Sequence, residues 1–203
     1  MLDKSLLEMT FKLHGHKDPA WPVGIRVGTA AMKALGVERA KNRELYCLCE
    51  TGVHPSMCFV DGVQFATGCT LGKGNIEKLD YGKNAITVID VKSKKAVRVT
   101  LRPEFQKKTL TSEFEKLRSQ GLHPQDIKPE VIDPIIDEIS SLPDEEILIV
   151  GDVFDVDFKP RKGAYEWYEC EKCREIVFAP GVRILDGKHL CIPCSGYRDI
   201  KVM

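Results

Sequence analysis

The chain has 203 residues, 43% of them hydrophobic and 30% charged, an ordinary composition for a soluble protein with one main core and a small appendage. Thirty Lys and Arg residues balance thirty Asp and Glu residues, so no excess of positive charge favours binding to nucleic acid or to an anionic membrane. We expect no secretory signal and no membrane-spanning helix, since neither apolar pattern is found, and therefore a cytoplasmic protein with reduced thiols.

Apolar residues at helical spacing predict three helices in the first third of the chain, over residues 3–13, 23–36 and 54–68. Gly36 and Gly68 are expected to end the second and third helices, because glycine adopts the left-handed conformation of a helix end at little cost. HGHKDP (14–19) is predicted to be a loop, because Pro19 disfavours helix at the residue before it. A strand is predicted over 44–50.

The second half of the large region begins with the clearest hairpin of the sequence. Strand-like residues over 85–91 and 95–101 are separated only by KSK. Residues 103–142 are charged with apolar residues at helical intervals, which predicts two or three helices interrupted at the HP pair at 123–124. Residues 145–158 are predicted to be one long strand or a bent pair.

A change of composition over residues 158–167 predicts a hinge. We therefore expect an α+β fold with two domains. A core domain of helices and a mixed, largely antiparallel sheet spans residues 1–160, and a small treble-clef-like zinc-binding module spans residues 161–203.

Two C-x-x-C steps form the most specific motif in the chain. Cys170 and Cys173 are separated by 17 residues from Cys191 and Cys194, the spacing of a four-thiolate zinc site. Four sulfurs at ~2.3 Å complete a tetrahedron and leave no position for a substrate, which predicts a structural zinc ion. A DG pair at 186–187 predicts a hairpin turn between the two steps.

Two disulfides, a redox dithiol and an iron site are the alternatives for these thiols. A reducing compartment disfavours disulfides, and a redox pair does not need a second C-x-x-C step. The spacing alone does not distinguish zinc from iron. From residue 161 onward eight basic residues exceed six acidic ones by two, and a zinc tetrathiolate carries −2, so contact with protein is favoured over nucleic acid.

Residues that bind metal or react also gather in the large domain. They are His14, His16, Cys58, Cys69 and Lys73. Cys58 is predicted near a helix N-terminus, where free N–H groups favour a thiolate, and Lys73 lies in a glycine-rich loop where it can meet an anion. We take the two histidines and two cysteines as a candidate second metal site, with Lys73 in the same candidate catalytic pocket. Shared coordination by His14 and His16 is not automatic, because residues two apart in an extended loop point to opposite sides.

Simple packing is the alternative for each of these groups. Free cysteines are among the most buried residue types, and we expect Cys47 and Cys49 on the predicted strand to be structural. His54 and His123 each precede proline and are expected to be loop or cap residues. The glycine-rich loop has no P-loop or dinucleotide fingerprint, so no nucleotide site is predicted.

The order of the motifs resembles the FmdE family of formylmethanofuran dehydrogenase proteins. HGH, MCFVDGVQ, TGCTLGKGN, DYGK and AVRVTL follow one another over about residues 11–101, and the tail resembles a zinc module that many members append. The resemblance implies that His16, Cys58 and Cys69 line a functional pocket. Asp18 stands where members usually carry a cysteine after HGH, which implies a carboxylate ligand or an altered metal preference.

Three functions are compatible with these residues. The first is a zinc-binding accessory or carrier protein of formylmethanofuran dehydrogenase or another metalloenzyme, as the resemblance implies, with a second metal ion or metal cofactor in the core pocket. The second is an enzyme with a metal-bound water or a cysteine nucleophile in that pocket and His16 as base. The third is a regulatory protein that binds protein or nucleic acid through the finger. We also expect a homodimer, because the predicted hairpin offers an exposed edge.

Overall fold

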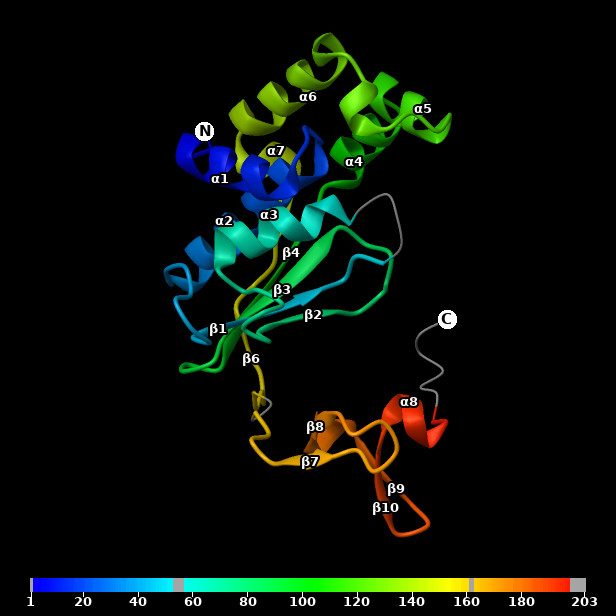
Figure 1. Ribbon diagram of the computed structural model, residues 1–203. Coiled ribbons are helices and arrows are strands. Elements are labelled where there is room, and N and C mark those ends of the chain that lie inside the picture. Colours follow the sequence, from blue (N-terminus) through cyan, green and yellow to red (C-terminus); the bar gives the residue numbers. More distant parts are fainter. Residues whose placement is uncertain (1, 53–56, 161–162, 198–203) are drawn as a thin grey trace. The chain divides into compact units, whose positions relative to one another are not determined.

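The computed structural model describes residues 2–52, 57–160 and 163–197, and the chain divides into two compact units, residues 1–160 and 161–203 (Figure 1). Within the described ranges, no helix combines the length and the hydropathy needed to cross a bilayer.

A six-stranded mixed sheet forms the centre of the first unit. Its strands are β1 Leu45–Cys49, β2 Ile76–Lys78, β3 Ala85–Asp90, β4 Lys95–Leu101, β5 Leu148–Val150 and β6 Phe154–Asp155. They run in the order β2-β1-β3-β4-β5, and β6 also pairs with β4. Only the pairing of β1 with β2 is parallel among these described pairs, and the others are antiparallel.

The predicted hairpin is confirmed as β3 and β4. The homodimer was expected because this hairpin would offer an exposed edge, and that reason is wrong. Strand β1 pairs with β3, and strands β5 and β6 pair with β4, so both hairpin strands lie inside the sheet. The edges of the sheet are instead the short strand β2 and the β5–β6 segment.

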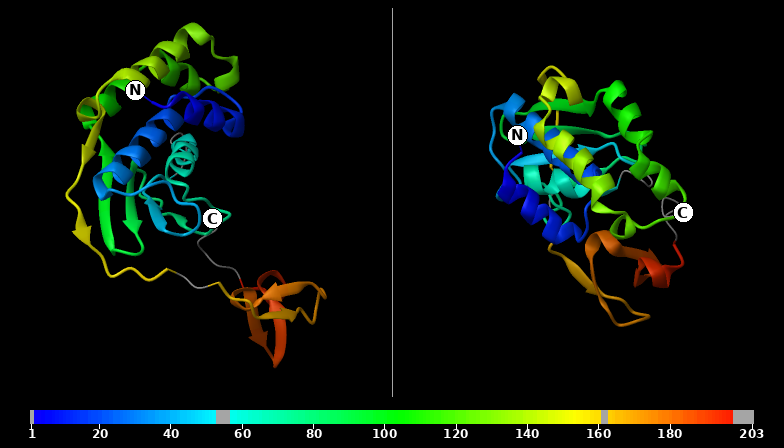
Figure 2. Two further views of the ribbon diagram at one scale, coloured as in Figure 1. Left: turned by 90° about the vertical axis from the view of Figure 1, so that its left-hand side faces the viewer. Right: turned by 90° about the horizontal axis from the view of Figure 1, so that it is seen from above.

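The described helices of this unit lie on one side of the sheet (Figures 1 and 2). They are α1 Lys4–His14, α2 Ala20–Leu35, α3 Cys58–Thr67, α4 Pro103–Leu110, α5 Glu113–Ser119, the 3-10 turn η1 Pro124–Asp126, α6 Pro129–Ser141 and α7 Asp144–Ile147. Gly36 and Gly68 end α2 and α3 with φ of 65° and 69°, as predicted. The helices expected within 103–142 are confirmed, since three of them and η1 occupy that stretch.

The backbones of helices α2 and α3 are in direct contact. A Cβ atom placed on Gly24 would lie 2.0 Å from the carbonyl oxygen of Phe59, and one on Gly62 would lie 1.9 Å from that of Trp21. No side chain fits at such distances, so glycine is required at both positions for the two helices to approach. The main core then fills the space between this helix pair and the sheet, with Val27, Phe59 and Val63 buried against the strands.

The structure refines the predicted elements in three places. Of the two alternatives predicted for residues 145–158, the pair of strands is found: β5 and β6 are separated by residues 151–153, and α7 takes the first part of the stretch. The strand β2 follows the glycine-rich loop and has no counterpart in the predictions. The third predicted helix begins at Cys58, and His54 lies outside the described residues.

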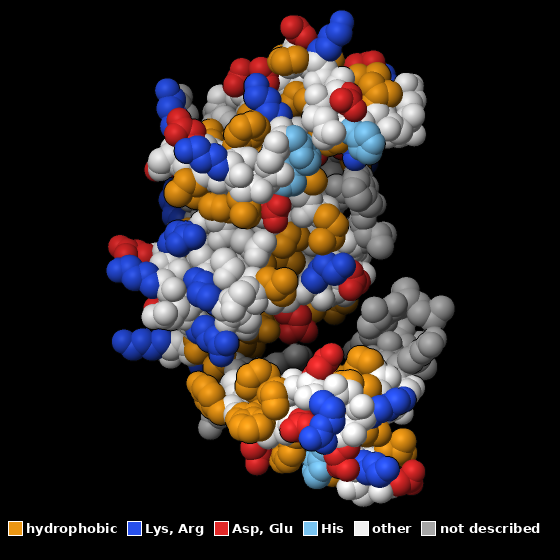
Figure 3. All heavy atoms as spheres, in the orientation of Figure 1, with side chains coloured by type: hydrophobic (Ala, Val, Ile, Leu, Met, Phe, Trp, Pro, Cys, Tyr) orange, Lys and Arg blue, Asp and Glu red, His pale blue; other side chains and the backbone are white. Residues whose placement is uncertain are grey.

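The second unit consists of two small hairpins and a short helix. Its elements are β7 Trp167–Glu169, β8 Ile176–Phe178, the 3-10 turn η2 Ala179–Gly181, β9 Val182–Leu185, β10 Lys188–Cys191 and α8 Ile192–Ser195. The DG pair turns the chain between β9 and β10 as predicted, with φ of 50° at Asp186 and 76° at Gly187. The buried residues of this unit are few, and hydrophobic side chains occupy much of its surface in Figure 3.

Candidate functional site

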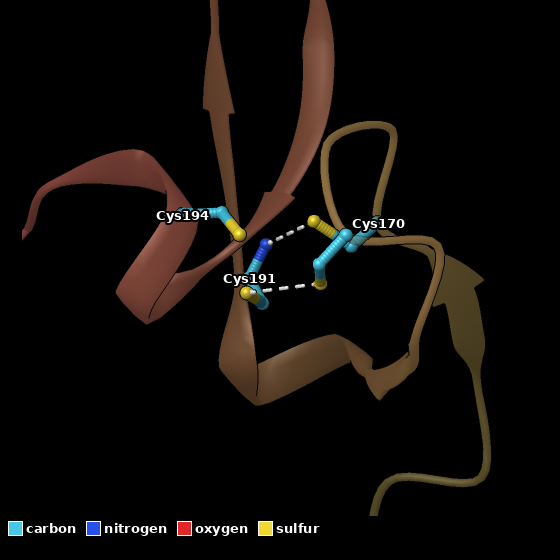
Figure 4. Close-up of side chains that lie close together, drawn as sticks. Cys170, Cys191 and Cys194 are labelled. Carbon is cyan, nitrogen blue, oxygen red and sulfur yellow. Dashed lines mark hydrogen bonds between the residues drawn. The ribbon is translucent and has the colours of Figure 1, made fainter.

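The four C-terminal thiols converge on one point. Cys170 follows β7, Cys173 lies in the turn after it, Cys191 ends β10, and Cys194 lies on α8. Their sulfur atoms lie within 4.8 Å of one another, and those of Cys173 and Cys191 are 3.9 Å apart. Figure 4 shows the side chains of Cys170, Cys191 and Cys194 gathered at this point. This set of four thiols is able to hold a metal ion such as zinc, whose tetrahedral coordination takes four sulfurs.

Hydrogen bonds from backbone N–H groups favour the thiolate form of Cys170, which is the form that binds a metal. The amide of Cys191 donates to the sulfur of Cys170 over 3.3 Å. Hydrogen bonds from the backbone of Cys173, and then of Cys191, lower the pKa of Cys170 to about 6. The pKa of Cys194 is instead raised to about 12, chiefly by its hydrogen bond with the Cys191 thiol. A bound cation would relieve the repulsion among the sulfurs, because each thiolate would then face a positive charge.

A second cluster lies in the first unit, where His14, His16 and Cys58 bring their ligand atoms within 4.8 Å of one another. His14 is the last residue of α1, His16 follows in the loop, and Cys58 is the first residue of α3. The two Nε2 atoms of the histidines are 3.1 Å apart. A tetrahedral zinc ion bound at ~2.0 Å holds two nitrogen ligands about 3.3 Å apart, so the observed spacing suits shared coordination. The two rings do not point apart as in an extended loop, because the backbone turns at Gly15 with φ of 89°.

Asp61 fixes the orientation of His14, and its role was not predicted from the sequence. Its Oδ2 atom lies 2.7 Å from Nδ1 of His14, and its Oδ1 accepts a hydrogen bond from Gln64 over 3.3 Å. A carboxylate at Nδ1 favours the tautomer that leaves Nε2 unprotonated, which is the form that binds a metal. The i, i+3 spacing from Cys58 was the available signal, because it places Asp61 on the same face of the helix.

The Cys58 thiol is held in its protonated form, so the predicted helix-terminus thiolate is wrong. Burial, followed by the negative charge of Asp18 and a hydrogen bond with it, raises the pKa of Cys58 to about 12. These effects exceed the small lowering that the helix backbone provides. Asp18 is 6% exposed and its Oδ1 accepts a hydrogen bond from the amide of Ala20 over 2.7 Å. Metal binding would displace the Cys58 proton.

The neutral form of His16 is favoured for a related reason. Burial, and then the charge of His14, lower its pKa below the ordinary 6.5, against opposing contributions from Asp18 and Asp61. Arg118 on α5 also acts on His16 with its positive charge. A neutral imidazole is the ligand form, so this environment supports metal binding near neutral pH.

The structure separates Cys69 and Lys73 from the other candidate residues. Cys58 begins α3 and Cys69 follows its end, and ten helical residues span about 15 Å. Cys69 is fully buried, and burial raises its pKa to about 11. The Lys73 ammonium donates to the carbonyl oxygens of Ala40 and Lys41, at 3.1 and 3.4 Å. A single pocket containing all five candidate residues is therefore not formed.

Cys47 and Cys49 have the structural role expected of them. Both are fully buried on the core side of β1, with their sulfur atoms 3.8 Å apart. A hydrogen bond with Cys49, and then burial, raise the pKa of Cys47 well above its ordinary value. His123 precedes η1 as its N-terminal cap residue, in agreement with a loop or cap role.

Comparisons with known proteins identify a matching family and a relative of this chain. The family model described as "FmdE, Molybdenum formylmethanofuran dehydrogenase operon" matches residues 13–149. A protein of Archaeoglobus fulgidus named "Probable S-adenosyl-L-methionine-binding protein" is 34% identical over 94% of this chain, and the match covers 52% of that protein. The chain thus spans about half the length of that relative.

A solved structure has the same fold. It is that of a tungsten formylmethanofuran dehydrogenase FmdE-like protein from Syntrophus aciditrophicus, with a TM-score of 0.63 and 24% identity. The match covers 95% of this chain and 91% of that one. Because both units of this chain fall within the matched region, the likeness supports the fold of each.

Proposed function

The chain belongs to the FmdE family, and from that premise we propose that it is a metal-binding accessory protein with two metal sites of different kinds. One is a structural zinc ion held by Cys170, Cys173, Cys191 and Cys194, which stabilises the small unit. The other is a metal ion held by His14, His16 and Cys58, which carries the function of the core unit.

The facing Nε2 atoms of His14 and His16 carry the proposal for the core site. They lie 3.1 Å apart with the Cys58 sulfur in the same group, and Asp61 orients one ring. Two imidazoles and one thiolate suit zinc and other first-row divalent ions. Three protein ligands leave one position of a tetrahedral ion for a water or a ligand, so this site differs in kind from a closed four-cysteine site.

The open position also favours a second candidate function. A metal with three protein ligands can lower the pKa of a bound water and act as a hydrolytic catalyst. In that case His16, the base expected from the sequence, would instead be a metal ligand, and the bound water would supply the nucleophile.

The partner and the assembly belong to the same proposal. The family description points to formylmethanofuran dehydrogenase as the partner class, and we extend it to this chain. The name of the Archaeoglobus relative suggests S-adenosylmethionine as a ligand of that protein, about half of which lies outside the matched region.

For a homodimer, the β5–β6 edge is a better surface than the β3–β4 hairpin, since Ile149, Val150, Val153 and Phe154 are each 42–45% exposed there. Sedimentation velocity of the full chain tests this assembly.

Metal content per chain tests the two-site proposal. We expect two zinc ions per chain, one after either Cys170→Ser or His16→Ala, and none after both substitutions. His123→Ala and Cys69→Ala are matched controls, because each changes a histidine or cysteine outside the two clusters, and both should keep two ions. A wild-type chain with one ion that is lost in Cys170→Ser would refute the core site and leave only the structural one.

A further inference from the structure

One face of the β7–β8 hairpin in the small unit is apolar and exposed. Trp167 on β7 lies directly opposite Phe178 on β8. The next pair on the same face is Glu169 and Ile176, because side chains alternate between the two sides of a strand. The side chains of Trp167, Ile176 and Phe178 are 59%, 57% and 60% exposed. Hydrophobic side chains gather in the region of β7 in the space-filling view (Figures 1 and 3).

The opposite face of the hairpin is occupied by the unit's own core. Tyr168 stacks on His189 of β10, with the two ring centroids 4.7 Å apart. Val177 packs against the buried cluster that contains Cys170 and Leu190. The side chains of the outer face are therefore not used by the zinc-binding core. Neighbouring aromatic side chains that remain exposed are typical of an interaction surface.

The size of the outer face suits a short helical segment of a partner. An aromatic side chain buries about 150–250 Å², so the exposed parts of Trp167 and Phe178 together offer roughly 200 Å². Each strand has three residues and is about 10 Å long, the length of about two turns of an α-helix. A two-stranded hairpin is stabilised when a helix packs against it. An amphipathic helix with one apolar stripe therefore fits this face.

The charges around the face favour a basic partner. Over residues 165–178, the exposed charged side chains are the acidic Glu166, Glu169, Glu171 and Glu175 and the basic Lys172 and Arg174. Arg174 is paired with Glu169 at 2.6 Å, and the excess of acidic residues remains. A symmetric contact between two copies of this chain would bring the same acidic residues together, and an anionic membrane would meet the same repulsion. Both are disfavoured relative to a protein segment that carries positive charge.

We propose that the outer face of the β7–β8 hairpin is a docking site for a basic amphipathic helix of a partner protein. The apolar stripe of that helix covers Trp167, Ile176 and Phe178, and its Lys or Arg side chains face the acidic residues around them. The inference rests on the proposed function, because the structural zinc holds the small unit together. The face is much smaller than the ~800 Å² per partner of a stable complex, so we expect weak binding.

The zinc-loaded full chain contains its own reporter for this binding. Of its two tryptophans, Trp21 is 3% exposed and Trp167 is 59% exposed, so covering the outer face should move the tryptophan emission to shorter wavelength. A synthetic amphipathic Leu–Lys helix should give a saturable shift. A Leu–Glu helix with the same apolar stripe, and a scrambled Leu–Lys peptide without a stripe, should each bind at least about tenfold more weakly. Equal binding of the Leu–Lys helix and either matched peptide overturns the proposal.

Variants of the face identify where the peptide binds. Phe178→Ser should weaken binding of the Leu–Lys helix by at least about tenfold, because it removes an aromatic anchor. Ile176→Ser should also weaken it and covers the case of an unfolded Phe178→Ser chain, which zinc content reveals. Ile184→Ser is the matched control, since Ile184 is 70% exposed on β9, outside the face, and it should leave binding unchanged. Unchanged binding in a zinc-loaded Phe178→Ser or Ile176→Ser chain contradicts the proposal.

Two other occupants of the face would give different results. A dimer of the wild-type chain in sedimentation velocity that is lost in Phe178→Ser would make the face a contact between copies of this chain. A larger emission shift with phosphatidylglycerol vesicles than with the Leu–Lys helix would make it a membrane contact. Either result overturns the proposal.

Zinc measurement on the same samples separates this inference from the proposed function. A chain that keeps zinc at its four C-terminal cysteines but gives no emission shift with the Leu–Lys helix would refute the docking site and leave the structural zinc in place. An emission shift that depends on Phe178 in a chain that takes up no zinc at these cysteines would support the docking site and refute the zinc site.

Discussion

Nδ1 of His14 and Oδ2 of Asp61 lie 2.7 Å apart, although 47 positions separate the two residues in the chain. The contact joins the end of α1 to the first turn of α3 and leaves Nε2 of His14 facing His16. The side chain of His14 is 8% exposed, so its orientation is fixed by packing as well as by this hydrogen bond. The arrangement is that of a metal-binding histidine supported by a carboxylate.

Asp61→Asn should therefore weaken metal binding at the core site without removing a ligand. Loss of such a supporting carboxylate lowers metal affinity by roughly 10–100-fold, because the imidazole is less basic and less well oriented. Cobalt(II) titration followed by visible absorption measures the metal affinity of the core site, since a site with one thiolate and a site with four thiolates absorb differently. Asp133→Asn, at a surface aspartate that pairs with Lys17, is the control and should have no effect. Equal affinity in the wild-type and Asp61→Asn chains would show that Asp61 has no supporting role.

Gly62→Ala should destabilise the first unit strongly. The added Cβ would lie 1.9 Å from the carbonyl oxygen of Trp21, so α2 and α3 must move apart, and overpacking of this kind costs about 1–3 kcal/mol or more. Thermal or urea unfolding followed by circular dichroism gives the change in free energy of unfolding. Gly72→Ala is the matched control, because no atom lies within 4 Å of its added Cβ, and it should leave stability nearly unchanged. An equally stable Gly62→Ala chain would mean that the two helices do not meet at this glycine.

Alkylation of Cys58 in metal-free protein should be slow, and Asp18→Asn should accelerate it. Burial is the first cause of the Cys58 pKa of about 12, and Asp18 adds its negative charge and a hydrogen bond. Removing that charge lowers the pKa and raises the fraction of reactive thiolate at a given pH. Mass spectrometry of iodoacetamide-treated, peptide-mapped protein gives the rate at Cys58 alone. Asp157→Asn, at an exposed aspartate outside the candidate site, is the control. A slower reaction in Asp18→Asn than in the wild type would reverse the assigned sign.

The Glu50–Arg98 ion pair should make the stability of the first unit depend on pH in the acid range. Nε and Nη2 of Arg98 donate to the two carboxylate oxygens at 2.6 and 2.8 Å, and this hydrogen bonding holds the pKa of Glu50 below its ordinary 4.5. The stabilisation is therefore complete above pH 4.5 and is lost as the pH falls through the lowered pKa of the folded protein.

Glu50→Gln removes this dependence. We expect about 1 kcal/mol of lost stability at pH 7, a modest value because the Arg98 side chain is 40% exposed and solvent screens the pair. As the pH falls below 4.5, the variant should lose less stability than the wild type in urea unfolding. Glu104→Gln, at an exposed glutamate of α4, is the control and should not reproduce the effect. Parallel pH profiles of wild type and Glu50→Gln would rule out a contribution from the pair.

Local pattern was enough for those parts of the protein that depend on neighbouring residues. The spacing of Cys170, Cys173, Cys191 and Cys194 identified the four-thiol cluster, because each C-x-x-C step is local and only 17 residues separate the two steps. The β3–β4 hairpin and the glycine-terminated helices were predicted for the same reason. The resemblance to the FmdE family also rested on motif order alone, and the family match confirms it.

Only the tertiary structure decided which distant residues meet. It joined His14 and His16 to Cys58, added Asp61, and placed Cys69 at the other end of α3, because a helix separates residues by a fixed rise along its axis. It also reversed the expected ionisation of Cys58, since burial beside Asp18 depends on how α2 and α3 pack. The β3–β4 hairpin lies inside the sheet because β1 pairs with β3 and β5 pairs with β4. Such pairing between segments far apart in the chain cannot be predicted from the residues of the hairpin alone.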